Sequence, residues 1–226
     1  MKKLNFITAA LLAITPLFVT AQVNQTPRHT GGNQITTMKE KSEPATGSMF
    51  VNDRFMPAKL SNNENPVLVR YNAYSDFFEV SNPQKENQTT LPKDPNVKIT
   101  FVSTRESYVY TPYTNKKGEA VSGYLNIVSD TPNVKIYKKE SIMLQPESFP
   151  ENSYQSYKAA NYKRSDDEFF VKVKDQGIVY LEGKKELAKL APEKSKEILE
   201  FVKKNKIDLE EEQDLLKLGE YMQSIL

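Results

Sequence analysis

Apolar and polar residues alternate along much of this chain, and the alternation is clearest over residues 67–80. One face of that stretch carries Val67, Val69, Tyr71 and Ala73, and the other carries Leu68, Arg70, Asn72 and Tyr74. Side chains that point to opposite faces at every second position are typical of a β-strand. Ser75 and Asp76 interrupt the alternation before Phe78 and Val80 resume it. The stretch therefore predicts a β-hairpin that turns at Ser75 and Asp76.

Further strands are predicted where short runs of alternating or β-favouring residues recur. They cover residues 49–55 with a turn at Asn52 and Asp53, 97–101, 108–110, 121–128, 134–138 with an extension to Leu144, 169–173 and 178–181. Turn-forming residues separate several of these stretches, at residues 115–118, 130–133 and 175–177. Sequential strands joined by short turns favour antiparallel pairing, so we expect a β-meander. Residues 81–96 and 146–163 are rich in proline and polar residues, which predicts irregular loops.

Near Gly183 the apolar period changes from two to the helical value. One helix is predicted over residues 186–190, and a second begins at Pro192, because proline is favoured in the first turn of a helix. Asp208, followed three residues later by Glu211, resembles a capping box and predicts the start of a third helix. The apolar stripe of that helix consists of Leu209, Leu215, Leu216, Leu218, Met222 and Ile225.

Together these patterns predict an α+β fold. We expect an antiparallel β-meander of about eight strands, curled or barrel-like, with two or three C-terminal helices packed on it. The β part covers residues 48–182 and the helical part covers residues 183–226. We treat residues 48–226 as a single domain, because a helical tail of this size would struggle to bury its apolar stripe alone.

The N-terminal residues 1–21 have the features of an export signal. Lys2 and Lys3 precede an apolar run, and Ala21 ends a cleavage motif of small or apolar residues. A transmembrane anchor is the alternative interpretation, but a run of about 16 apolar residues is short for a bilayer span. We therefore expect a cleaved signal peptide and an exported protein, periplasmic or secreted, without an integral membrane anchor. Residues 22–47 are polar and broken by proline and glycine, which predicts a flexible leader.

Composition narrows the chemistry of the folded part. The 31 Lys and Arg residues nearly balance the 29 Asp and Glu residues, so nothing favours binding to nucleic acid. The chain has no cysteine, which excludes disulfides and thiol nucleophiles. Its one histidine, His29, lies in the leader, so the folded part has no Ser-His-Asp triad and no histidine metal site. We predict no catalytic residue, no cofactor and no metal.

Four residues are the candidates for binding a ligand or partner. Arg70 and Asp76 bracket the predicted hairpin, and they form either an ion pair or a ligand-binding charge. Tyr108 and Tyr110 could form an aromatic platform for a glycan or peptide, or pack within the sheet as strand aromatics usually do. The acidic run at residues 166–168 is either a solvated turn or part of a calcium or paired-carboxylate site.

Several segments in order resemble one known group of proteins. They are residues 47–55, 67–76, 137–139 and 163–170, followed by the Lys-Lys-x-Leu start of the helical tail at Lys184. This order resembles a family of uncharacterised exported proteins from bacteroidete-type bacteria, over residues 47–226. The resemblance implies export and a single α+β unit. It implies no activity, cofactor or catalytic residue.

Three functions are consistent with these observations. The leading hypothesis is an exported, non-catalytic envelope or secreted protein that binds a protein partner or an envelope component. The second is a carrier of a small apolar, lipid-like ligand, whose β-rich cavity would be lined by Phe101, Leu125, Ile127 and Ile136. The third is a carboxylate-based hydrolase, which needs two acids in one cleft; Asp76, Asp166 and Asp167 are its first candidates.

Overall fold

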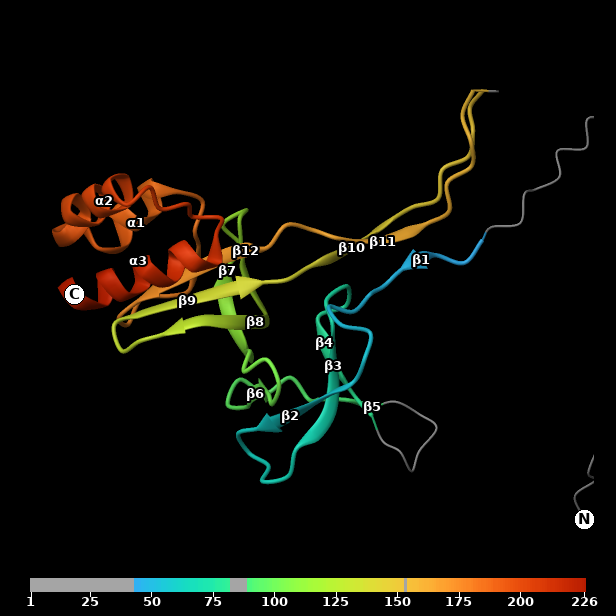
Figure 1. Ribbon diagram of the computed structural model, residues 1–226, viewed down its shortest axis with the longest axis horizontal. Coiled ribbons are helices and arrows are strands. Elements are labelled where there is room, and N and C mark those ends of the chain that lie inside the picture. The colour runs from blue at the N-terminus through green and yellow to red at the C-terminus, as the bar shows by residue number, and fades with distance from the viewer. Residues whose placement is uncertain (1–42, 82–88, 153) are drawn as a thin grey trace, which may run out of the picture. The chain divides into compact units, whose positions relative to one another are not determined.

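A computed structural model describes residues 43–81, 89–152 and 154–226 of the chain (Figure 1). These residues form a ten-stranded sheet, a three-stranded sheet and three α-helices, and they belong to one compact unit over residues 41–226. The fold is therefore α+β, as the sequence predicts. The predicted signal peptide and the leader up to residue 42 lie outside the described residues.

Short strands dominate the described chain. They are β1 (Thr46–Gly47), β2 (Met56–Leu60), β3 (Val67–Asn72), β4 (Phe77–Val80), β5 (Thr89–Thr90), β6 (Lys98–Phe101), β7 (Ser107–Thr114), β8 (Ala120–Asp130), β9 (Val134–Lys139), β10 (Ile142–Gln145), β11 (Asn161–Arg164), β12 (Glu168–Val173) and β13 (Val179–Tyr180). The helices are α1 (Lys184–Leu190), the 3-10 helix η1 (Pro192–Lys194), α2 (Ser195–Lys204) and α3 (Glu212–Ile225).

The large sheet closes on itself at one end. Its strands follow the order β13-β12-β9-β8-β7-β6-β2-β3-β4-β5, and β13 also pairs with β7. That closing contact is parallel and places Val179 opposite Thr114, whose N–H donates to the Ile178 carbonyl at 2.9 Å. The strands β7, β8, β9, β12 and β13 thus form a ring, which confirms the predicted curled, barrel-like sheet.

Side chains fill the interior of this ring. Leu125, Tyr137, Phe170 and Ile178 are buried there, and partly buried neighbours such as Ile127 pack against them. The rings of Tyr113 and Phe170 meet edge to face at 4.8 Å between centroids. The interior is therefore a packed core.

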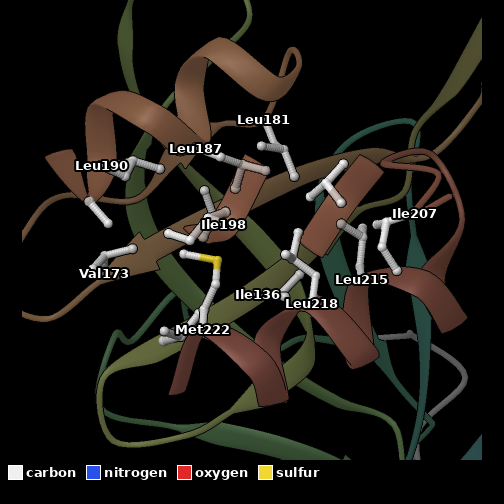
Figure 2. Packing of buried hydrophobic residues seen from close by; sticks show 14 of the residues in the cluster. Ile136, Val173, Leu181, Leu187, Leu190, Ile198, Ile207, Leu215, Leu218 and Met222 are labelled. Atoms are coloured by element: carbon white, nitrogen blue, oxygen red, sulfur yellow. The ribbon is translucent and has the colours of Figure 1, made fainter. Parts of the chain in front are cut away.

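The three helices cover the opposite face of β8, β9 and β12 (Figure 2). Period-two alternation decides which residues of β12 meet the helices: Phe169, Val171 and Val173 face the helices, whereas Phe170 faces the ring interior. The helices contribute aliphatic side chains at helical spacing. Figure 2 shows Leu187, Leu190, Ile198, Leu215, Leu218 and Met222 converging on Ile136, Val173 and Leu181.

Aromatic side chains form a second cluster under β2, β3, β4, β6 and β7. Phe78 lies at its centre and is fully buried. Its ring centroid lies 4.9 Å from that of Tyr71, 4.9 Å from that of Tyr124 and 5.3 Å from that of Tyr108. The β3–β4 hairpin that the alternation predicts is confirmed by the antiparallel pairing of the two strands, and the face that carries Val69, Tyr71 and Ala73 is buried.

Four local predictions were wrong. The bends at residues 51–54 agree with the turn predicted at Asn52 and Asp53, but the strand predicted over residues 49–55 is wrong. The strand lies later, at β2, and the only bridge that Phe50 makes among the described residues is an isolated one to Asn72. The strand at 134–138 ends at Lys139, and residues up to Leu144 belong to β10 in the other sheet. The third error is common to the two predicted loops, because residues 81–96 contain β5 and residues 146–163 contain all of β11 except Arg164.

The start of α3 is the fourth error. The helix begins at Glu212, and its N-cap Glu211 makes no side-chain capping hydrogen bond. The Asp208 side chain instead accepts from the Glu210 N–H, while the Asp208 N–H donates to Asp214 at 3.0 Å. The pattern of a capping box was present, but the chain turns once more before the helix starts.

Candidate functional site

Arg70 forms an ion pair, and its partner is Glu79 on the neighbouring strand. Its Nε and Nη2 atoms lie 2.8 and 2.7 Å from Glu79 Oε2, and the two residues are directly opposite in the β3–β4 pairing. The guanidinium group also lies 3.7 Å from the ring centroid of Phe50 and 4.5 Å from that of Phe55. Arg70 is thus held between aromatic rings at the surface of the hairpin.

Asp76 pairs instead with a lysine far along the chain. It occupies the hairpin turn with a φ of 54°, and its Oδ1 atom lies 2.5 Å from Lys139 Nζ. The same oxygen accepts from the Tyr71 hydroxyl at 2.7 Å and from the Tyr124 N–H at 3.2 Å. The Lys139 ammonium completes its bonding with the Tyr71 hydroxyl and the Tyr124 carbonyl, both at 3.1 Å.

Burial dominates the electrostatics of this cluster. It lowers the pKa of Lys139, and the facing Asp76 carboxylate offsets part of that effect. It also raises the pKa of Tyr71 well above its ordinary value, and the charge of Asp76 adds to this rise. Gly123 allows the close approach, because a Cβ atom there would lie 2.7 Å from Asp76 Oδ2 and 3.3 Å from Lys139 Nζ.

Tyr108 takes part in a second buried network. Its hydroxyl donates to Glu140, which is only 3% exposed, and Glu140 Oε1 lies 2.8 Å from Arg164 Nη2. Arg164 also contacts Asp167 Oδ1 at 2.9 Å. Burial raises the pKa of Tyr108 strongly, and the charge of Glu140 raises it further. The ring of Tyr110 packs edge to face on Tyr124 at 5.3 Å.

The four candidates thus lie in one half of the sheet, but they do not converge on one group. Tyr71 and Tyr124 connect Asp76, Tyr108 and Tyr110, because Tyr71 bonds Asp76 and packs 5.4 Å from Tyr108, while Tyr124 contacts Asp76 and Tyr110. Of the acidic run, Asp167 pairs with Arg164 and Asp166 is exposed. Within the described residues, no group of three or more His, Cys, Asp or Glu could hold a metal.

Lys139 and Glu140 belong to these buried networks but were not among the candidates predicted from sequence. Both follow Lys138 at the end of β9, so three charged residues stand in a row where the pattern predicts a strand. A strand that is covered on both faces must bury some members of such a run, and buried charges need partners. Lys138 pairs with Glu212 on α3. Lys139 pairs with Asp76, and Glu140 accepts from the Tyr108 hydroxyl, so both contact the half of the sheet that holds the aromatic cluster, which we call the aromatic half. The run of three charged residues at 138–140 was therefore the feature of the sequence that could have identified them.

A hairpin arm leads away from this half of the molecule. We define the arm as residues 141–152 and 154–165, which include β10 and β11, and its tip as residues 146–152 and 154–157. Figure 1 shows β10 and β11 continuing from β9 and β12 on the side away from the helices. Large apolar side chains are exposed along the arm: Met143 is 61% exposed, Phe149 46% and Tyr154 97%.

The base of the arm is tied to the rest of the sheet. Arg164 at the end of β11 bridges Glu140, which follows β9, and Asp167, which precedes β12. Ile142 is buried, and its N–H donates to the Ala73 carbonyl at 3.3 Å. This contact and the missing N–H of Pro146 leave β10 only a short edge for pairing with another strand. The arm therefore offers a partner little strand edge, and its exposed aromatic side chains lie at the tip.

Two half-enclosed cavities are lined by residues of the aromatic cluster. One, of about 120 Å³, is walled mainly by Leu60, Leu91, Val97, Ile99 and Tyr124. The other, of about 110 Å³, lies beside Arg70 and Tyr108. Phe101 lines the second cavity, but Leu125, Ile127 and Ile136 line neither. Both are smaller than typical ligand pockets of about 300–1,000 Å³.

No family model, curated protein or solved structure matches this chain. None of the helices in the described ranges is long and apolar enough to cross a bilayer. Any conclusion about function therefore rests on the residues and their geometry.

Proposed function

We propose that this is an exported, non-catalytic envelope or secreted protein that binds a protein partner or an envelope component through the tip of the arm. One observation carries the proposal: the tip presents exposed aromatic side chains on a hairpin whose base is fixed by the ion pairs of Arg164 with Glu140 and Asp167. Phe149 and Tyr154 are the exposed aromatics, and Tyr157 packs 5.3 Å from Phe149.

Aromatic tips are effective contact points for physical reasons. A Tyr or Phe side chain buries a large area for the loss of only two rotatable bonds, which is why such residues dominate binding energies at interfaces. A nearly fully exposed tyrosine such as Tyr154 contributes nothing to the core, so its apolar surface is available for a partner.

The anchored base lowers the cost of binding. Ordering a mobile element at an interface costs conformational entropy, and an element that is already fixed avoids part of that cost. The bridge from Arg164 to Glu140 and Asp167 joins both ends of the arm to the body. It therefore sets the direction in which the tip is presented.

The buried polar groups support a non-catalytic role. Asp76, Lys139, Glu140 and the Tyr108 hydroxyl are bonded to one another or to protein groups within the sheet. Groups that satisfy each other in this way stabilise a particular packing arrangement. They have the partners expected of structural residues.

A carrier of a small apolar molecule is the second candidate. The cavity walled by Leu60, Leu91, Val97 and Ile99 favours it, because its lining is mainly apolar. Its volume of about 120 Å³ suits a small ring or a short aliphatic group, because a cavity of about 150 Å³ holds benzene. A lipid chain would require the cavity to open.

Site-specific photocrosslinking in the producing cells tests the arm. A benzophenone amino acid replaces Tyr154 at the tip, and a matched variant carries it at Lys196, which is exposed on α2. We expect a discrete crosslinked protein from position 154 and none from position 196, identified by mass spectrometry. Equal crosslinking at both positions, or none at position 154, would contradict the proposal.

A second experiment separates binding from folding. Replacing Phe149 and Tyr154 with serine should leave the free energy of unfolding within about 0.5 kcal/mol of the parent value, because both side chains are exposed. The same variant should lose capture of the partner that position 154 identifies. If the serine variant still captures that partner at the parent level, the tip is not the binding element.

A further inference from the structure

The cavity of about 110 Å³ beside Arg70 has a lining with two kinds of chemistry. Its apolar wall consists of Val51, Met56 and Phe101, together with the rings of Tyr71 and Tyr108. Val51 precedes β2, Met56 begins β2, Tyr71 lies in β3, Phe101 ends β6 and Tyr108 lies in β7. The wall belongs to the aromatic cluster, so it is rigid and already formed.

The rim of this cavity carries charges of both signs. Arg54 and Glu106 line it together with Arg70. The Arg70 charge is compensated by Glu79 at 2.7 Å. Within residues 43–81, 89–152 and 154–226, the Arg54 and Glu106 side chains form no ion pair with each other or with a third residue. Two residues that line the cavity thus carry opposite charges, and no ion pair among the described residues compensates either of them.

A ligand with a single charge fits such a rim poorly. A plain carboxylate attracted to Arg54 would lie in the same small cavity as Glu106, and an amine attracted to Glu106 would lie beside two arginines. Like charges at close range oppose binding. A molecule that carries both charges meets both groups, and an apolar substituent between them would contact Met56 and Phe101.

We infer that this cavity binds a small zwitterion, specifically a free α-amino acid with a short apolar side chain. Its carboxylate pairs with Arg54, its ammonium group pairs with Glu106, and its side chain lies against the thioether of Met56. A cavity of about 150 Å³ holds benzene, so a half-enclosed cavity of about 110 Å³ suits a compact ligand whose charged ends reach its rim. This size excludes peptides and lipids. The inference does not depend on the function of the arm.

Methionine-methyl NMR on the full-length mature protein tests the inference. Met56 lines the cavity, whereas Met143 is exposed on the arm, so the chain contains its own control. L-valine is the probe, compared with isovalerate, which lacks the ammonium group, and isobutylamine, which lacks the carboxylate. We expect a saturable shift of the Met56 methyl signal with L-valine and no shift of Met143.

The two analogues decide the class of ligand. Each should bind at least about tenfold more weakly than L-valine, because each loses one charge-assisted hydrogen bond. If isovalerate binds as tightly as L-valine, the site is a simple anion site and the zwitterion inference is wrong. An absent Met56 shift, or equal shifts at Met56 and Met143, would show that the cavity is not a binding site for this class.

Charge-neutralising variants complete the test. Arg54→Gln and Glu106→Gln should each weaken L-valine binding at least about tenfold. Lys59→Gln and Glu64→Gln are the matched controls, because both residues are exposed and neither lines the cavity. The methyl spectrum reports folding in the same sample. If the cavity variants bind as the controls do, the inference fails, while the proposed role of the arm is unaffected.

Discussion

The two large hydrophobic clusters of this protein bury side chains of different chemistry. The cluster under the helices is aliphatic, with Ile136, Leu187, Ile198 and Leu215 among its buried members. The cluster under β2, β3, β4 and β6 is aromatic, centred on Phe78. Both bury their central side chains almost completely. They differ in what else must be buried with them.

Tyrosine hydroxyls explain the difference. A buried hydroxyl needs a hydrogen-bond partner, and an unpaired one is costly. The aromatic half buries Tyr71 and Tyr108, and it also holds the charged groups that bond them, Asp76 and Glu140. The buried aliphatic cluster contains no tyrosine; Lys138 beside it is buried to the same extent as Lys139, but its partner Glu212 has a side chain that is 43% exposed, so that pair reaches the surface. In the aromatic cluster, the partners of the buried Tyr71 and Tyr108 hydroxyls are therefore charged side chains.

Truncating the centre of the aromatic half should have the largest effect. Phe78→Ala removes a fully buried ring that contacts four other rings, and we expect a loss of about 4 kcal/mol in unfolding free energy. The counterpart in the aliphatic half is Leu215→Ala, with an expected loss of about 3 kcal/mol. Urea unfolding followed by circular dichroism measures both. A loss below about 1 kcal/mol for Phe78→Ala would contradict the packed aromatic cluster.

Breaking the buried ion pair should have the next largest effect. Lys139 is a buried residue, only 8% exposed, and Asp76→Ala leaves its ammonium group without a charged partner. We expect a loss of about 3 kcal/mol in unfolding free energy. Adding Lys139→Met removes the stranded charge, so the double variant should be more stable than Asp76→Ala alone. The same unfolding assay gives the coupling energy. If the two single losses simply add, the residues do not interact as described.

A single added methyl group tests the close approach at Gly123. Gly123→Ala should cost about 2 kcal/mol, because the new Cβ atom would lie 2.7 Å from Asp76 Oδ2 and would disturb its bond to Lys139. Gly177→Ala is the control, since no heavy atom lies within 4 Å of a Cβ there. Thermal unfolding of the two variants compares them directly. Equal midpoints would show that the Asp76–Lys139 contact is loose.

Alkaline pH should produce the smallest effect per residue. Burial raises the pKa of Tyr71 and Tyr108 above the ordinary value of 10.0, and raises the pKa of Tyr124 to about 12. A raised folded-state pKa means that the unfolded state loses its proton first. The stabilisation is therefore complete below pH 10 and is lost as pH rises through the folded-state pKa values.

We expect each such tyrosine to cost up to about 1.4 kcal/mol per pH unit above pH 10.0. Lys139 acts in the opposite sense, because its lowered pKa makes stability rise with pH only up to its ordinary value of 10.5. Urea unfolding at about pH 8 and about pH 11 measures the net loss. Tyr108→Phe should reduce that loss, and an unchanged loss in this variant would contradict the assignment.

Local patterns predicted much of the fold. The alternation over residues 67–80 correctly indicated the β3–β4 hairpin and its buried face, and the change of period near Gly183 correctly indicated the helices. These predictions succeed because the direction of a side chain follows from backbone geometry over a few residues. The boundaries at β2 and α3 failed, since the exact end of an element depends on what the chain meets next.

The site was predicted less well. Arg70 and Asp76 were chosen as neighbours on one hairpin, yet Arg70 pairs across the strands with Glu79 and Asp76 pairs with Lys139. The residues were correctly recognised as charges that need partners. Their partners could not be chosen from sequence, because many lysines and acids were available and local spacing favours none of them.

The sequence by itself determined the strands, the helices and the faces that they bury, because each depends on the period of apolar residues along a short stretch. Only the tertiary structure decided that β13 closes the ring, that Lys139 reaches Asp76 across 63 residues, and that Arg54 and Glu106 share a cavity. Such contacts depend on the path of the whole chain. A charge selects its partner by distance in space and by burial, and neither quantity is written in the local pattern.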